Sequence, residues 1–211
     1  MAAAGLAAVG AAIRSILSAR QEQSARKKAQ AIKAADEIDS FYDHPAVWLA
    51  TRIIDYENLT IEKSDVDCLQ NSMNSKDVWN FLVYHADVDL MEARKSDGLS
   101  SVFGHDERRI RDLFDKFLTK LERIEKLIDN EVIFQADFGD FFSYWLQLMT
   151  EVPSPGDRVS HLSDSIRRIL WKYIRGYEYR GVVRLFALYD RACPVGVDPD
   201  EAFSARSNTV R

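Results

Sequence analysis

The sequence predicts an all-α protein: an irregular helical bundle with a long N-terminal helix and a disordered C-terminal tail. One segment repeats apolar residues at alternating steps of four and three, which places them along one face of a helix. Proline or glycine separates several of the helical segments, where these residues start or end helices. No segment shows the period of two that predicts a half-buried strand. The repeating apolar residues are Ile110, Phe114, Phe117, Leu121, Ile124 and Ile128.

Length and composition predict an ordinary globular domain with tails. The chain has 211 residues, of which 46% are hydrophobic and 29% are charged. These values are typical of a folded domain that buries a sizeable core. The net charge of −5 favours solubility and argues against extensive contact with nucleic acid. We expect an N-terminal helix over residues 1–35, a helical bundle domain over 36–192 and a disordered tail over 193–211.

The N-terminal segment leaves two interpretations open. Its first thirteen residues are uncharged and mostly alanine, and Arg14 interrupts them before the length of about 20 residues that a membrane span needs. The preferred interpretation is a frayed, alanine-rich helix. The alternative is a segment that associates with a membrane or anchors in it, because bases follow the apolar stretch. A cleaved secretory signal is disfavoured, since no base precedes Arg14. The following bases are Arg20, Arg26, Lys27, Lys28 and Lys33.

Helical segments then follow one another. Pro45 suits a first helical turn, and Ser64, Ser75 and Ser163 suit N-caps. Residues 138–149 are apolar on almost every side, which is typical of a helix in the centre of a fold. We expect helices over residues 13–42, 45–57, 65–71, 75–95, 106–130, 138–149, 164–176 and 182–191. We expect one core cluster of Phe117, Leu121, Ile124, Trp145, Leu148, Ile169, Leu170 and Tyr173.

No motif for catalysis, cofactor binding or metal binding is present, so we predict no catalytic, cofactor or metal residues and a non-enzymatic role. The histidines, which are His44, His85, His105 and His161, match neither the di-iron pattern of helical bundles nor the zinc-protease helix. The spacing of Cys68 and Cys193 matches no zinc motif. Two free thiols are preferred over one disulfide between them.

Two charge clusters suggest binding surfaces. Residues 36–67 hold nine acids against Arg52 and Lys63, and residues 167–191 hold seven bases against Glu178 and Asp190. Aromatic residues lie among these bases, a mixture that can bind single-stranded nucleic acid. The preferred interpretation is that the aromatics belong to the core and that the arginines face solvent, some pairing with the acidic cluster. The candidate partner-binding residues are Arg167, Arg168, Arg175, Arg180 and Arg184.

A loose resemblance covers residues 30–190. The helix over 110–128, then Asp140-Phe141-Phe142-Ser143-Tyr144-Trp145, then Trp171-Lys172-Tyr173-Ile174, then Tyr179-Arg180-Gly181-Val182-Val183-Arg184-Leu185-Phe186 resembles a group of uncharacterised bacterial helical proteins. Several of these carry an N-terminal membrane segment. The resemblance implies a bacterial origin and a helical domain, and it implies no activity.

Taken together, these observations favour a cytoplasmic interaction protein, with attachment to the inner face of the membrane as a variant. We expect an unknown protein partner, with a membrane surface or a second copy of the chain as further partners and nucleic acid disfavoured. The alternatives are a nucleic-acid-binding module that uses the basic C-terminal helices and an enzyme of unrecognised type.

Overall fold

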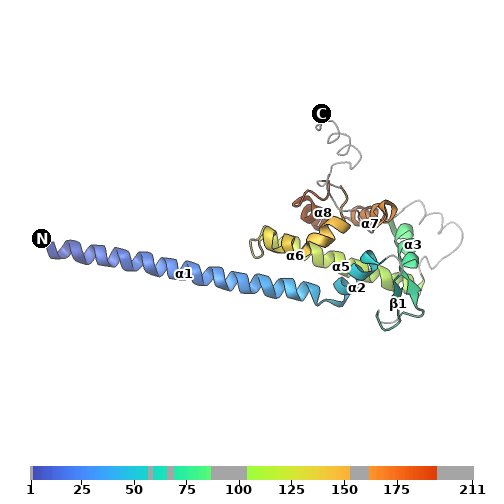
Figure 1. Cartoon of the computed structure of the whole chain (residues 1–211), viewed down its shortest axis with the longest axis horizontal. Helices are drawn as coiled ribbons and strands as arrows, with labels where there is room; N and C mark the ends of the chain where they lie inside the picture. The colour runs from blue at the N-terminus through green and yellow to red at the C-terminus, as the bar shows by residue number, and fades with distance from the viewer. Residues whose placement is uncertain (1, 57–58, 66–68, 87–103, 153–161, 194–211) are drawn as a thin grey trace, which may run out of the picture. The chain divides into compact units, whose positions relative to one another are not determined.

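A computed structural model describes residues 2–56, 59–65, 69–86, 104–152 and 162–193. These ranges are almost entirely helical, which confirms the all-α class and the helical bundle (Figure 1). The chain divides into two compact units, Met1–Ser40 and Phe41–Arg211, which we describe separately. The predicted disordered tail lies outside the described ranges beyond residue 193.

The first unit belongs to α1, a single helix over Ala2–Tyr42. The helix is longer than the predicted 13–42, and its first turns contain Gly5 and Gly10. Alanine has the highest helix propensity, and its abundance in this segment offsets the cost of the two glycines. Among the helices that the structure describes, α1 included, none combines the length and apolar character needed to cross a membrane.

The second unit opens with α2 over Pro45–Asp55. Pro45 occupies the first helical turn, and Nδ1 of His44 accepts a hydrogen bond from the backbone N–H of Ala46 at 3.2 Å. This histidine therefore serves as an N-cap, a role usually taken by Ser, Thr, Asp or Asn.

Two short strands lie on either side of the helix predicted over 65–71. β1 (Thr60–Ile61) pairs with β2 (Met73–Asn74) in antiparallel register, Thr60 opposite Asn74 and Ile61 opposite Met73. The structure describes residues 65 and 69–71 of the helix predicted over 65–71, and none of them is helical, so the prediction is wrong there. The backbone N–H groups of Gln70 and Asn71 instead donate hydrogen bonds to the carboxylate of Asp106, at 2.7 and 3.2 Å. A contact distant in sequence therefore overrides the local helix signal.

The remaining helices agree with the predicted segments to within four residues, except the helix predicted over 75–95, of which residues 87–95 lie outside the described ranges. Glu107 accepts a hydrogen bond from the backbone N–H of Gly104 at the start of α5, and Oγ of Ser163 accepts one from Ile166 at the start of α7. Both contacts satisfy backbone donors that a helix start leaves unpaired. The helices are α3 (Ser75–Ala86), α5 (His105–Asp129), α6 (Gln135–Leu148), α7 (Asp164–Gly176) and α8 (Arg180–Ala187).

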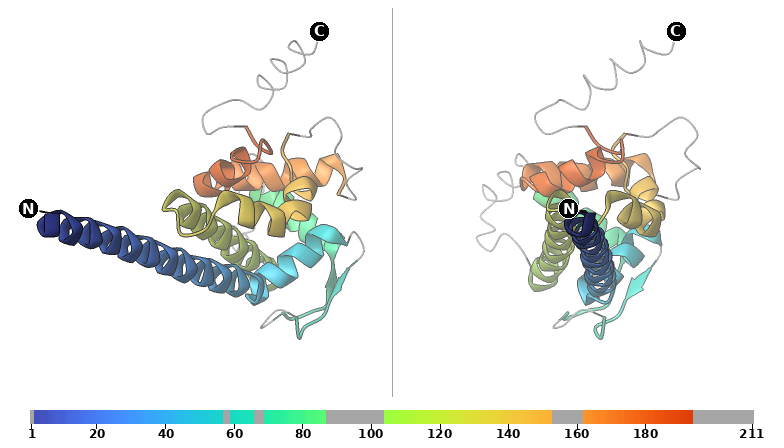
Figure 2. Two further views of the ribbon diagram at one scale, coloured as in Figure 1. Left: turned by 60° about the vertical axis from the view of Figure 1, so that its left-hand side comes forward. Right: turned by 90° about the vertical axis from the view of Figure 1, so that its left-hand side faces the viewer.

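Helix α5 lies at the centre of the second unit. It packs against α2, α3 and α8, and α7 packs against α3 and α8. Both views in Figure 2 place α7 and α8, drawn in orange, on the same side of α5. The apolar repeat of α5 is buried as predicted, except that Ile128 near the helix end is half-buried.

The predicted position of α6 needs correction. Phe138 and Phe142 are buried, but Phe141 is 61% exposed and Tyr144 is 46% exposed. The helix therefore covers the bundle with one face and is not enclosed on all sides. Trp145 and Ile169, which we expected in the core cluster, are only partly buried. The other six residues of that predicted cluster are buried.

The burial of Phe117 predicts a strong dependence of stability on its side chain. Phe117→Ala should reduce the free energy of unfolding by about 3–5 kcal/mol, because it removes a fully buried ring and leaves a cavity. Urea denaturation measures the change. Phe141→Ala is the matched control and should shift the free energy by no more than about 0.5 kcal/mol, as surface substitutions do. Equal losses in the two variants would contradict this description of the core.

Candidate interaction surface

Helix α6 is anchored to the bundle by aromatic packing. The rings of Phe138 and Phe142 stack with centroids 5.0 Å apart. The ring of Phe41 meets both edge-on, at 5.9 and 5.6 Å. Edge-to-face and stacked pairs of this kind add to the free energy gained from burial. The buried face of α6 therefore has a fixed orientation, and so do the residues on its other faces.

A second face of α6 presents aromatic rings to solvent. Phe134 directly precedes the helix, and Phe141 and Tyr144 follow it by seven and ten positions, so the three residues lie along one side. All three are exposed. Phe141 also contacts the ring of Tyr42, with centroids 5.7 Å apart, and its backbone oxygen accepts a hydrogen bond from the Tyr42 hydroxyl.

Helix α2 contacts α6, and α2 with its C-cap residue carries two further exposed rings. The hydroxyl of Tyr144 donates a hydrogen bond to the carboxylate of Asp55. Burial, then this hydrogen bond, raises the pKa of Tyr144 to about 12, which keeps the hydroxyl a donor at neutral pH. Trp48 and Tyr56 are exposed, and the guanidinium of Arg52 lies 4.5 Å from the centre of the Trp48 ring. We call the five exposed rings the aromatic surface: Trp48, Tyr56, Phe134, Phe141 and Tyr144.

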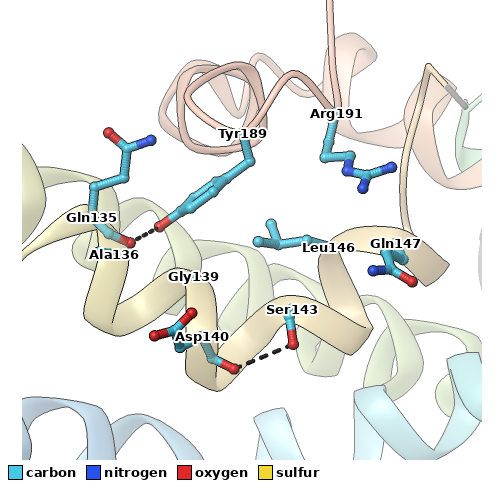
Figure 3. Close-up of a pocket in the computed structure, with 9 residues that line it drawn as sticks. All are labelled: Gln135, Ala136, Gly139, Asp140, Ser143, Leu146, Gln147, Tyr189 and Arg191. Atoms are coloured by element: carbon cyan, nitrogen blue, oxygen red, sulfur yellow. Dashed lines mark hydrogen bonds between the residues drawn. The ribbon is translucent and has the colours of Figure 1, made fainter. Parts of the chain in front are cut away.

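A shallow polar groove of about 580 Å³ follows a third face of α6 (Figure 3). The ring of Tyr189 lies over Gly139, where a Cβ atom would come within 2.7 Å of its Cε1. The Tyr189 hydroxyl donates to the backbone oxygen of Gln135 at 2.6 Å. The groove is lined by Gln135, Ala136, Gly139, Asp140, Ser143, Leu146, Gln147, Tyr189 and Arg191.

The groove offers hydrogen bonds and contains no arrangement for bond cleavage. Its lining includes one carboxylate, one guanidinium, two side-chain amides and hydroxyl groups, and neither His nor Cys. Oγ of Ser143 donates to the backbone oxygen of Asp140, so that serine is not aligned with a general base. Within the ranges that the structure describes, no three His, Cys, Asp or Glu side chains gather to hold a metal ion.

Two of the predicted partner-binding arginines make internal contacts. Arg175 forms two hydrogen bonds of 2.6 Å to the carboxylate of Glu151 and one of 3.1 Å to the backbone oxygen of Cys193. Arg184 forms two to the carboxylate of Glu125, at 2.6 and 3.1 Å. Both acids are largely buried. Both guanidinium groups therefore connect α7 or α8 to other parts of the bundle.

The other three arginines make only local contacts or lie exposed. Arg167 pairs with Asp164, and Arg180 pairs with Glu178 at 3.3 Å. Arg168 is exposed. The acids that pair with Arg167, Arg175, Arg180 and Arg184 all lie outside residues 36–67. These contacts therefore do not include the expected pairing with the acidic cluster. Whether any of the five arginines contacts a partner stays a prediction.

The aromatic residues of the basic stretch serve the core. Tyr173 is buried, and its hydroxyl and that of Tyr179 donate to the same carboxylate oxygen of Asp115, at 2.5 and 2.7 Å. The indole N–H of Trp171 donates to the backbone oxygen of Met149 at 2.7 Å. The rings of Tyr173 and Trp171 are therefore unavailable for stacking on nucleic-acid bases, as the preferred interpretation of the sequence expects, whereas Tyr179 is half-buried.

Sequence reasoning missed the aromatic surface. The signal was present in residues 138–149, whose apolar character on every side we interpreted as central burial. In the structure, one apolar face of this helix packs on the bundle and another is exposed to solvent. Cys193 is buried, and Cys68 lies outside the described residues, so their predicted state as two free thiols stays a prediction.

The contact between Arg184 and Glu125 predicts a cost when the arginine is removed. Arg184→Met leaves the carboxylate of Glu125, a residue only 6% exposed, without its cation and should reduce stability by about 1–3 kcal/mol. Thermal or urea unfolding measures this loss. Arg168→Met removes an equal charge from an exposed position of α7 and should cost less than about 0.5 kcal/mol. The idea fails if both variants lose the same stability.

The environment of Tyr189 predicts a loss of stability in alkali. Burial, then the charge of Asp140, raises the pKa of Tyr189 to about 12 from its ordinary value of 10.0. Below pH 10 the Tyr189 hydroxyl is neutral in both the folded and the unfolded chain. Above pH 10 it ionises first in the unfolded chain, so the free energy of unfolding should fall between pH 10 and 12. Tyr189→Phe should lessen that fall, measured as urea midpoints against pH. Tyr56→Phe, at an exposed ring, should leave the slope unchanged, and an identical slope in both variants would contradict the prediction.

Comparison with known proteins gives no match: no family model, curated protein or solved structure is similar to this chain. The resemblance to bacterial helical proteins therefore stays a prediction, and the function has to be argued from the surface itself.

Proposed function

We propose that this chain is a non-enzymatic interaction module that binds a polypeptide partner through the aromatic surface on α2 and α6. The observation that supports this proposal is the exposure of Phe141 and Tyr144 on a helix whose opposite face is already buried. In this proposal the protein acts in the bacterial cytoplasm, with attachment to the inner face of the membrane as the variant expected from residues 1–35.

The chemistry of the surface suits a protein partner. Tryptophan, tyrosine, phenylalanine and arginine are enriched where proteins bind one another. Tryptophan and tyrosine often dominate the binding free energy. Large rings gathered on one surface mark interaction sites more often than scattered apolar residues do. Arg52 above Trp48 adds a cation–π contact that also holds the indole in a defined orientation.

The polar groove can contribute specificity to the same partner. It follows the third face of α6, which is neither the buried face nor the one with the exposed rings, and presents hydrogen-bonding groups such as Gln147 and Asp140. A segment that passes over α6 would bury apolar side chains on the aromatic surface and form hydrogen bonds in the groove. Division of the site into apolar anchors and a polar rim is the usual anatomy of a protein interface.

The nucleic-acid alternative has less support. Arg175 and Arg184 are bound to Glu151 and Glu125, and Tyr173 and Trp171 are buried. A basic surface that lacks free stacking rings has only electrostatic attraction to offer, and the net charge of −5 opposes that attraction.

Site-specific photo-crosslinking tests the proposal. A photoreactive amino acid placed at Phe141 of the full chain in cells should give a discrete protein adduct that mass spectrometry identifies. The same amino acid at Lys76, an exposed residue of α3, is the control and should not give that adduct. Absence of an adduct at position 141, or the same adducts at both positions, would overturn the proposal.

Binding of the identified partner then provides a quantitative test. Phe141→Ser and Trp48→Ser should each weaken binding about 30-fold, the effect of removing an interface residue worth about 2 kcal/mol. Both residues are exposed, so the unfolding transition should remain that of the unmodified chain. Binding that survives both substitutions would show that the partner uses a different surface.

A further inference from the structure

The first unit contains an exposed helix face with one large apolar residue at its centre. Ile32 of α1 is 64% exposed. The residues that lie on the same side of the helix, three, four and seven positions away, are exposed as well. They are Ala25, Lys28, Ala29, Ala35, Asp36 and Asp39, and we call these six together with Ile32 the Ile32 face.

Charge on α1 changes sign close to Ile32, between Lys33 and Asp36. The helix carries Arg26, Lys27 and Lys28 just before this residue and Asp36, Glu37 and Asp39 just after it. The arrangement is nearly symmetric about Ile32, because Lys28 precedes it by four positions and Asp36 follows it by four. Eight residues of helix separate these two side chains by about 12 Å, too far for a direct ion pair within one helix.

We propose that two copies of this chain pair through their Ile32 faces as antiparallel helices, with a two-fold axis at Ile32. In this arrangement, a residue that precedes Ile32 meets the residue that follows it by the same number of positions in the second copy. Lys28 of each copy then lies beside Asp36 of the other, and the two Ile32 side chains contact each other across the axis. Such an interface is self-complementary, as a two-fold dimer requires.

The charge pattern also selects the antiparallel direction. Parallel helices in register would place Lys28 beside Lys28 and Asp36 beside Asp36, and like charges at close range repel. The antiparallel direction replaces each of these repulsions by an attraction. Alanine at positions 29 and 35 lets the helix axes approach closely enough for the Ile32 side chains to meet.

The size of this surface predicts a weak, reversible dimer. Each copy contributes one large apolar side chain and several alanines, so the interface belongs to the small, transient class. Its ion pairs are exposed and screened by salt, so the dimer should dissociate on dilution and at high ionic strength. The inference is independent of the partner proposed for the aromatic surface.

Disulfide trapping in the full chain tests the geometry, with Cys68 and Cys193 replaced by alanine. Ile32→Cys should form a linked homodimer under mild oxidation. A mixture of Lys28→Cys with a size-tagged Asp36→Cys chain should give mainly the mixed dimer. Lys33→Cys, on the flank of the same helix, is the control and should link poorly. Absence of the Ile32→Cys dimer overturns the proposal, and preferential self-linking of Lys28→Cys shows parallel helices and overturns it too.

Sedimentation equilibrium tests the role of charge without added cysteines. Lys28→Asp should raise the dimer dissociation constant about tenfold or more, and the double exchange Lys28→Asp with Asp36→Lys should restore it. Ile32→Asp should abolish association. All of these positions are exposed on α1, so the unfolding transition should stay the same. A chain that remains monomeric at every concentration, or a double exchange that fails to restore association, would overturn the proposal.

Discussion

Burial of the apolar repeat of α5 is the constraint on which the second unit depends. Ile110, Phe114, Phe117 and Leu121 are fully buried, and they occupy the side of the helix that faces its neighbours. Because the repeat averages 3.5 residues, this contact line runs along the whole helix and can receive several elements. Helices α2, α3 and α8 all pack against α5, so each of them is placed relative to the same central element.

Acidic residues on α5 then determine how the corner between α7 and α8 is attached. Asp115 accepts hydrogen bonds from two tyrosine hydroxyls, and Glu125 binds the guanidinium of Arg184. Between them, Oε1 of Glu122 accepts a hydrogen bond from the backbone N–H of Gly181 at 2.9 Å. A Cβ atom at Gly181 would lie 2.9 Å from Cγ of Glu122, so glycine permits this close approach. Contacts of Tyr173, Tyr179, Gly181 and Arg184 therefore attach the basic stretch to α5.

Helix α6 carries the candidate binding surface. A helix that packs with one face leaves its other faces to solvent, and on α6 those faces present exposed rings on one side and a polar groove on another. Two of the rings have defined contacts: Phe141 packs against the ring of Tyr42, and the hydroxyl of Tyr144 donates to Asp55. A rigid, preorganised surface loses little conformational entropy when a partner binds.

The amino-acid pattern alone predicts the helical class, the buried repeat of α5 and the starts of α2 and α7 at Pro45 and Ser163. These features depend on periodicity and on capping within a few residues, which are local properties of the chain. Only the tertiary structure decided that Phe141 faces solvent, that Arg184 pairs with Glu125, and that residues 69–71 are not helical. Each of these depends on a neighbour many positions away, such as Asp106 at the start of α5, and an apolar pattern alone does not say which of two faces another element will cover.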